Sequence, residues 1–118
     1  MIENLFQSGI FKLHSGKTSR FKIECDALTD ADWATLAEMI AMRAGAFGSV
    51  FGIPRGGVKL AEQLERFITT GPRLVVDDVW TTGGSMLEVL NQGDDAGFVV
   101  FARNTPTHGV RALFTMEG

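Results

Sequence analysis

Two consecutive carboxylates, Asp77 and Asp78, stand at the end of an apolar run in the middle of the chain. Residues 74–76 precede them, and a short apolar run bounded by turn residues predicts a buried parallel strand. In open α/β sheets the carboxyl ends of such strands face the ligand crevice. Two adjacent buried acids are costly without a ligand, so this pair predicts a binding site rather than ordinary core.

A segment rich in hydroxyls and glycines follows the acids. It consists of Thr81, Thr82, Gly83, Gly84 and Ser85. It leads into apolar residues at helical spacing, Met86, Leu87 and Leu90. Free backbone N–H groups at a helix start, together with hydroxyls and glycines, form a cradle for an anion. The stretch therefore suits a ligand with a phosphate at one end and hydroxyls or a metal at the other.

A second strand–loop–helix unit lies earlier in the chain. Residues 49–53 predict a strand, and residues 58–67 predict a helix. The loop between them contains Arg55, Gly56 and Gly57. Its backbone amides can face an anion, and the Arg55 guanidinium can bind a phosphate through two hydrogen bonds. We therefore predict a second anion-binding loop.

Other patterns predict the elements that position these two loops. Strands are expected at residues 10–13 and 21–25, joined by a long polar turn, and a helix at residues 29–44, capped by Thr29 with Asp32. A third helix is expected to run to about residue 92. Two closing strands are expected at residues 98–102 and 110–116.

Composition limits the class of protein. The 118 residues fit one domain with a single core, spanning residues 1–118. The net charge of −3 gives no electrostatic basis for nucleic acid or a membrane as a partner. The lone cysteine, Cys25, excludes an internal disulfide and permits a reducing compartment. Without a secretory signal or an apolar run of membrane-spanning length, a cytoplasmic protein is expected.

The sequence VVDDVWTTGGS, residues 75–85, resembles the phosphoribosyl pyrophosphate (PRPP) signature of type I phosphoribosyltransferases. The resemblance implies that Asp77 and Asp78 bind the ribose hydroxyls and that the 81–85 loop holds the 5-phosphate. FGIPRGGVKLAEQL resembles the pyrophosphate loop of the same superfamily. The implied fold is an α/β parallel sheet of about four strands, with helices on both faces and an N-terminal hood hairpin. The implied cofactor is Mg²⁺, held by the two acids indirectly, through PRPP.

The sequence FKLHSGKTSRFKIECDAL resembles the hood of orotate phosphoribosyltransferases. This resemblance implies a hood at residues 5–25 and a core at residues 29–118, with orotate as the base and a homodimer as the assembly. Its implied base and hood contacts are His14, Lys17, Arg20 and Arg103. Taken without the resemblance, the three turn residues among these also fit a solvated turn.

Only residues 69–73 connect the second helix to the PRPP strand. The family that this sequence resembles usually carries another strand and a long basic lid at this point. A lid excludes water and completes the site in many transferases. Three functions therefore stay open: an orotate phosphoribosyltransferase-like enzyme, a PRPP- or nucleotide-binding protein without turnover, and a generic phosphate-binding α/β domain.

Overall fold

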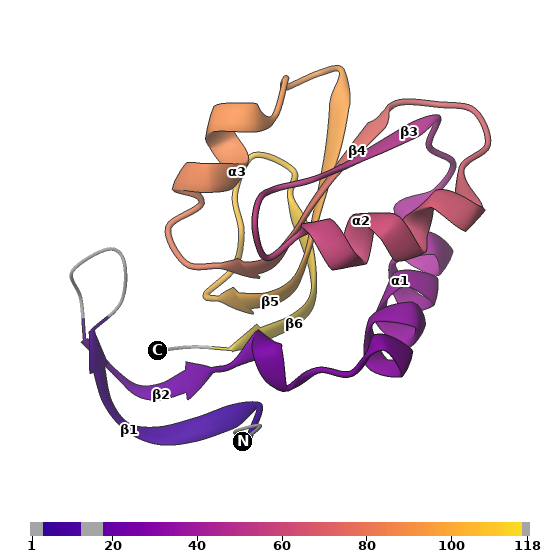
Figure 1. Ribbon diagram of the computed structural model, residues 1–118. Coiled ribbons are helices and arrows are strands. Elements are labelled where there is room, and N and C mark those ends of the chain that lie inside the picture. The colour runs from indigo at the N-terminus through magenta and orange to yellow at the C-terminus, as the bar shows by residue number, and fades with distance from the viewer. Residues whose placement is uncertain (1–3, 13–17, 117–118) are drawn as a thin grey trace.

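The computed structural model describes residues 4–12 and 18–116, with only the backbone described for Arg20 and Phe21. Two strands pair as an antiparallel hairpin, and four parallel strands form the main sheet in the order β3-β4-β5-β6. The hairpin strands are β1 (Phe6–Lys12) and β2 (Thr18–Ile23); the sheet strands are β3 (Ser49–Gly52), β4 (Arg73–Trp80), β5 (Asp95–Arg103) and β6 (Arg111–Met116). Figure 1 shows the hairpin lying across the end of the sheet toward which the strand arrows point. The expected sheet and hairpin are confirmed. The hairpin strands, expected at residues 10–13 and 21–25, both start earlier, because pairing extends from Phe6 with Ile23 to Lys12 with Thr18.

Three α-helices and two short 3₁₀ helices complete the described chain. These are η1 (Cys25–Ala27), α1 (Asp30–Ala44), α2 (Val58–Leu64), η2 (Glu65–Phe67) and α3 (Gly84–Val89). The third helix ends at Val89, whereas it was expected to run to about residue 92. The strand expected at residues 98–102 begins earlier, at Asp95, because Asp95 pairs with Arg73 of the neighbouring strand.

A capping interaction between Thr29 and Asp32 sets the start of helix α1. The Thr29 hydroxyl accepts the Asp32 N–H at 3.1 Å, and the Asp32 carboxylate accepts the Thr29 N–H at 2.9 Å. This reciprocal pair satisfies two N–H groups that the first turn would otherwise leave open. The helix buries Trp33, Ala37 and Ile40 on the side that faces the sheet.

The main sheet separates two apolar cores. Alternate residues of β4 point to opposite faces, so Leu74 and Val76 join the core under α1 and α2, whereas Val75 joins the core under α3. The expected placement of helices on both faces is thus confirmed. None of the helices in residues 4–12 and 18–116 has the length and apolar character needed to cross a membrane.

The two helical crossovers have opposite hands. Strands β3, β4 and β5 are parallel and follow one another across the sheet, so both crossovers step in the same direction. Helix α2 packs on one face and α3 on the other. Two crossovers that step the same way on opposite faces must differ in hand, so one of them is left-handed. Right-handed crossovers are found in about 98% of cases, so this is an uncommon topology.

The link between η2 and β4 lies at the amino end of the sheet. Thr69 N–H donates to the Phe47 carbonyl at 2.9 Å, and Gly48 N–H donates to the Pro72 carbonyl at 3.0 Å. Gly71 fits closely here, since a Cβ on it would lie 2.7 Å from the Ala46 carbonyl oxygen. The link is therefore fastened beside the start of β3, at the end of the sheet opposite Asp77 and Asp78.

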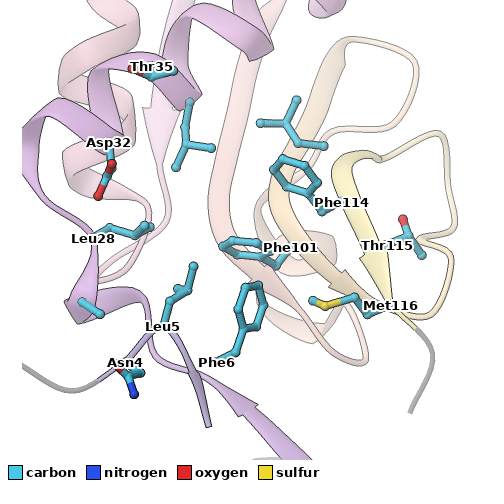
Figure 2. A pocket seen from close by; sticks show the side chains of 13 residues that line it. Asn4, Leu5, Phe6, Leu28, Asp32, Thr35, Phe101, Phe114, Thr115 and Met116 are labelled. Atoms are coloured by element: carbon cyan, nitrogen blue, oxygen red, sulfur yellow. The ribbon is translucent and has the colours of Figure 1, made fainter.

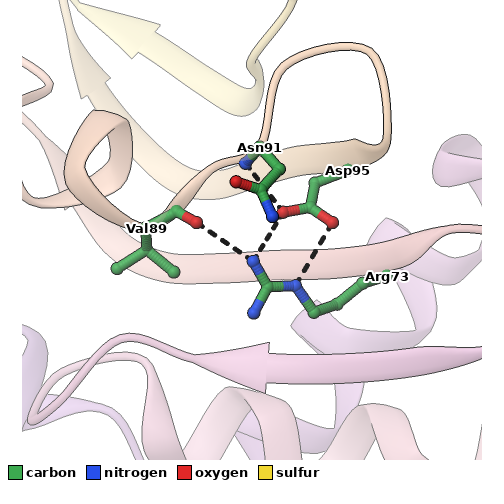
Figure 3. Close-up of polar contacts among 4 residues, drawn as sticks. All are labelled: Arg73, Val89, Asn91 and Asp95. Atoms are coloured by element: carbon green, nitrogen blue, oxygen red, sulfur yellow. Dashed lines mark hydrogen bonds and ion pairs between the residues drawn. The ribbon is translucent and has the colours of Figure 1, made fainter.

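A polar cluster ties the amino ends of β4 and β5 together (Figure 3). The Arg73 guanidinium donates to both carboxylate oxygens of Asp95, at 3.2 and 2.5 Å, and to the Val89 carbonyl at 3.0 Å. The Asn91 N–H donates to the same carboxylate at 2.8 Å. The Asp95 side chain is only 6% exposed, and the Arg73 guanidinium lowers the pKa of its carboxyl group.

Replacing Arg73 with Met is expected to lower the free energy of unfolding by about 2 kcal/mol, because it leaves a buried carboxylate without its counter-ion. A depressed native pKa stabilises the fold above the unfolded pKa and stops doing so as the pH falls through the native pKa. The difference between wild type and variant should therefore shrink below about pH 4. Urea denaturation at neutral and acidic pH measures both effects.

Arg66→Met is the matched control for this prediction. Arg66 is exposed, donates a hydrogen bond to the Ala34 carbonyl and lies over the Phe67 ring, and its loss should cost less than about 1 kcal/mol. Equal losses for the two variants at neutral pH would contradict a special role for the Arg73–Asp95 pair.

Candidate functional site

The predicted ligand-binding segments meet in one hollow at the carboxyl end of the main sheet. This central hollow has a volume of about 570 Å³. It is lined by Phe11, Lys12, Lys22, Ile23, Pro54, Arg55, Gly56, Asp77, Asp78, Val79, Thr81, Ser85 and Arg103. Segments far apart in the sequence are thereby brought together, and each of the predicted anion loops contributes to the hollow.

The loop at residues 81–85 surrounds a smaller hollow next to the central one. Its volume is about 160 Å³, and it is lined by Asp77, Val79, Trp80, all five residues of the loop, Met86 and Val99. Gly83 adopts a left-handed conformation with φ of 86°, and a Cβ on it would overlap the Trp80 indole ring. The loop can therefore turn tightly over Trp80 only with glycine at this position. Hydroxyls and backbone of this loop face a space suited to one phosphate group.

Asp77 and Asp78 lie beyond the last paired residue of β3. The β3–β4 register ends at Gly52 and Val76, so the two acids emerge where the neighbouring strand has stopped. The Asp77 carboxylate accepts the Asp78 N–H at 2.8 Å, and the Asp78 carboxylate accepts the Val79 N–H at 2.8 Å. Asp77 also lines the smaller hollow inside the 81–85 loop, whereas Asp78 also lines a hollow on the side of α2. The two carboxylates therefore lie on opposite sides of β4. Asp77 faces the 81–85 loop, and Asp78 faces the Arg55–Gly56 loop.

Burial changes the protonation of this pair. Burial, followed by the hydrogen bond and the negative charge of Asp78, raises the pKa of Asp77 to about 8. At neutral pH one proton is therefore held at Asp77, which relieves the repulsion between two close carboxylates. A ligand that donates hydroxyl hydrogen bonds or brings a cation would favour the ionised pair.

The Arg55–Gly56 loop touches the acids directly. A Cβ on Gly56 would overlap the Asp78 carboxyl group, so glycine lets the loop backbone lie against this side chain. Arg55 and Gly56 both line the central hollow. Gly57 lies beneath the loop, where its N–H donates to the Ile53 carbonyl at 2.8 Å. Its part in pyrophosphate binding stays a prediction.

Arg103 connects the hood hairpin to the end of β5. It is only 4% exposed, yet it lines the central hollow, and its Nη1 donates to the Ser19 hydroxyl at 2.7 Å. Burial lowers the pKa of its guanidinium. Of the other predicted hood contacts, His14 and Lys17 lie outside the described residues. Arg20 belongs to β2, but its side chain lies outside the described part of the chain.

The sequence interpretation missed three residues at the site. Lys12 and Lys22, on the two hood strands, line the central hollow. Cys25 is buried, and its thiol forms a hydrogen bond with the Asp78 carboxylate. Burial and this neighbouring acid raise the pKa of the thiol, so it stays protonated. The hood resemblance spans all three positions but gives none of them a role, because only the fold of the hood over β4 brings them to the acids.

A larger cavity lies elsewhere, with a volume of about 1020 Å³. Figure 2 shows Phe6, Phe101 and Phe114 side by side along it, with Asp32 on the α1 side. Phe6 meets Phe101 edge-on at 5.9 Å, and Phe114 stacks on Phe101 at 5.6 Å. Among its described lining residues, Asp32 alone is charged, and none is shared with the central hollow. It therefore offers no cation to a phosphate and is not the predicted site.

The donor set at the acids fits a metal held partly by its ligand. Within residues 4–12 and 18–116, no cluster of three or more His, Cys, Asp or Glu side chains is arranged to bind a metal ion by itself. Mg²⁺ commonly uses one or two carboxylates together with substrate phosphates and water. Asp77 and Asp78 beside a phosphate loop match that pattern, and Mg²⁺ stays a prediction.

Comparison with known proteins identifies the fold. The chain is similar to orotate phosphoribosyltransferase from Aeropyrum pernix, with 23% identity and a TM-score of 0.73 over 94% of this chain and 88% of that one. It is similar to the Mycobacterium tuberculosis H37Rv orotate phosphoribosyltransferase, with 17% identity and a TM-score of 0.67 over 92% and 86%. It also matches Leishmania donovani UMP synthase, with 17% identity and a TM-score of 0.75 over 95% of this chain and 34% of that one.

Neither protein-family models nor curated protein sequences give a match to this chain. At the identities of the structural matches, the likeness establishes architecture rather than activity. The sheet, the hood hairpin and the helices on both faces nevertheless agree with the expectation from the sequence. The chain therefore has the fold of the type I phosphoribosyltransferases, similar to that of the orotate phosphoribosyltransferases.

Proposed function

We propose that this protein binds PRPP and transfers its ribose 5-phosphate group to a nucleobase, with orotate as the base. The observation that carries the proposal is the convergence of two anion loops and two acids on one hollow. A phosphate hollow of about 160 Å³ lies on one side of the acids, and the Arg55–Gly56 loop lies on the other. A sugar with a phosphate at one end and a diphosphate at the other fits this order.

Each group has a defined part in the reaction. The 81–85 loop anchors the 5-phosphate, and the ionised Asp77 and Asp78 accept hydrogen bonds from the ribose hydroxyls. Arg55 and the amide of Gly56 bind the diphosphate. A base nitrogen then bonds to the anomeric carbon as the carbon–oxygen bond to pyrophosphate breaks, and the electron pair leaves with pyrophosphate. Mg²⁺ bound with PRPP would supply further charge neutralisation for this leaving group.

The base is assigned to the side of the hollow that the hood covers. Arg103 is held there by Ser19, and its guanidinium suits an anionic base carboxylate. Orotate carries such a group, and the structural matches include orotate phosphoribosyltransferases. A homodimer, a cytoplasmic location and a place in pyrimidine biosynthesis stay predictions.

A second function is a PRPP-binding protein without turnover. The observation that favours it is the position of the link at residues 68–72, which is fastened at the amino end of the sheet. From there it cannot cover the central hollow. Efficient transfer needs water to be excluded from the cation-like transition state.

One experiment separates these functions. Wild-type protein is titrated with PRPP and Mg²⁺ by calorimetry, and pyrophosphate release is then followed with orotate, uracil, adenine, guanine and hypoxanthine. The enzyme hypothesis expects PRPP binding and pyrophosphate release that is fastest with orotate. Binding without release for any base would support the second function. An absence of PRPP binding would refute both.

A further inference from the structure

The hood hairpin contributes two lysines to the central hollow. Lys12 ends β1 and Lys22 lies within β2, and both line the hollow together with Arg55 and the two acids. Both lie within the sequence that resembles the hood, but neither was among the residues expected to contact the ligand. Their positions depend only on how the hairpin folds across the carboxyl end of the sheet.

Charge is unevenly distributed in this protein. The whole chain carries a net charge of −3. The central hollow is the reverse, because its described charged residues comprise four cations and two acids: Lys12, Lys22, Arg55, Arg103, Asp77 and Asp78. A positive hollow in an acidic protein concentrates and binds an anion of high charge.

The four cations differ in their freedom to meet a ligand. Arg103 is buried and holds the Ser19 hydroxyl. Arg55 stands on the loop beside Asp78. The hood lysines are different, since Lys12 is exposed and the Lys22 side chain is 43% exposed. A lysine ammonium on a flexible stem can follow a charged group as it binds and leaves.

Lys22 also has a partner that places it on the diphosphate side. Its ammonium lies 3.1 Å from the Glu24 carboxylate. Glu24 lines a hollow of about 770 Å³ that also contains Arg55, Gly56 and Asp78. The ion pair therefore stands next to the loop assigned to the diphosphate. The other candidate for a cover, the link at residues 68–72, is fixed at the far end of the sheet.

Resting on the proposed function, we propose that Lys22, assisted by Lys12, binds the diphosphate of PRPP and stabilises it as it leaves. The hood then supplies from its own strands the mobile positive charge over the leaving group. The bond that breaks joins the anomeric carbon to a diphosphate oxygen, and the new negative charge on that oxygen is met by the lysine ammonium groups. No proton or electron is exchanged with the lysines.

The test compares two ligands that divide PRPP between them. Pyrophosphate with Mg²⁺ probes the diphosphate side, and ribose 5-phosphate probes the 81–85 loop. The variant is Lys12→Gln with Lys22→Gln, which keeps most of the side-chain length and removes both charges. Calorimetry should show pyrophosphate binding at least about 10-fold weaker in this variant, a loss of about 1.4 kcal/mol. Ribose 5-phosphate binding should stay within about threefold of wild type.

Two controls make the outcome specific. Lys12→Arg with Lys22→Arg should retain pyrophosphate binding, because the charge is kept. Arg43→Gln removes one charge from the last turn of α1, where Arg43 lines neither the central hollow nor the hollow beside Glu24. This variant should leave both affinities near those of wild type.

Unchanged pyrophosphate affinity in the double Gln variant would overturn the inference. An equal loss for both ligands would also overturn it, since the lysines would then act only through the general field. If wild type binds neither ligand, the proposed function itself fails, which is a distinct result. If wild type binds both and only the double Gln variant loses pyrophosphate, the inference stands.

Discussion

Replacing Asp77 with Asn is expected to raise stability at alkaline pH and to abolish most PRPP binding. The stability effect follows from the pKa of Asp77, which burial and the neighbouring Asp78 raise to about 8. An unfolded aspartate titrates near 3.9, so between about pH 4 and pH 8 the native state holds a proton that the unfolded state has lost. Native stability is therefore greatest below the unfolded pKa and is lost as the pH rises through 8.

The asparagine that replaces Asp77 in this variant does not ionise, so it adds no pH dependence to the stability. Its amide oxygen can still accept the Asp78 N–H that the carboxylate accepts at 2.8 Å. The thermal midpoint of wild type should therefore fall between pH 5 and pH 9, while that of the variant stays nearly level across this range. At pH 9 the variant should melt about 5 °C above wild type, a shift that corresponds to about 1 kcal/mol.

The same substitution stabilises the fold at alkaline pH but is expected to weaken PRPP binding. An amide presents N–H donors where a ribose hydroxyl needs an acceptor, and it removes a negative charge near a bound cation. Affinity for PRPP with Mg²⁺ should fall about 100-fold, in line with the loss of charged hydrogen bonds. Asp94→Asn is the control, because Asp94 is an exposed acid in the turn before β5. Parallel melting profiles, or PRPP binding equal to that of wild type, would contradict the place given to Asp77.

Gly83→Ala is expected to cost about 3 kcal/mol of stability and to remove phosphate binding by the 81–85 loop. The backbone at Gly83 has φ of 86°, which an L-residue adopts only at a cost. A methyl group there would also overlap the indole ring of Trp80. Trp80 is 5% exposed and packs in the core under α3, so its ring cannot step aside freely.

Gly93→Ala separates the two causes. Gly93 has a similar φ of 91°, but a Cβ on it would meet nothing within 4 Å. Its substitution should cost about 1 kcal/mol, from the backbone alone. Urea denaturation measures both variants, and titration with ribose 5-phosphate reports on the loop. A Gly83→Ala variant no less stable than Gly93→Ala would show that the loop does not depend on its contact with Trp80.

The strands and loops of the site follow from short-range patterns. An apolar run ending in two acids predicts β4, and a glycine-rich hydroxyl loop predicts the start of α3, because side-chain alternation and helix-terminus chemistry operate over a few residues. The Thr29–Asp32 cap predicts α1 for the same reason. Boundaries followed less closely, and α3 ends at Val89 because the next residue, Leu90, takes an extended conformation with φ of −71° and ψ of 120° while packing in the core.

Contacts between distant segments could not be derived in this way. Arg103 was predicted to contact the nucleobase. Its hydrogen bond to Ser19 was not predicted, because it joins residues 84 positions apart. Lys12 and Lys22 lie within the hood sequence but had no predicted role, and they reach the hollow only because the hairpin lies across the sheet (Figure 1). The opposite hands of the two crossovers also depart from the usual preference, so a general rule would have placed α2 or α3 on the wrong face.

The sequence by itself determined which chemical groups this protein offers: two acids, a loop of hydroxyls and glycines, and a second glycine loop that carries Arg55, each encoded within a few consecutive residues. Tertiary structure decided how they act together. Consecutive acids face opposite loops because a strand alternates its side chains across the sheet. The pKa of Asp77 rises because the fold buries it beside Asp78. The short link lies at the far end of the sheet because its backbone bonds to residues 47 and 48, so the hood alone supplies the described cover of the hollow.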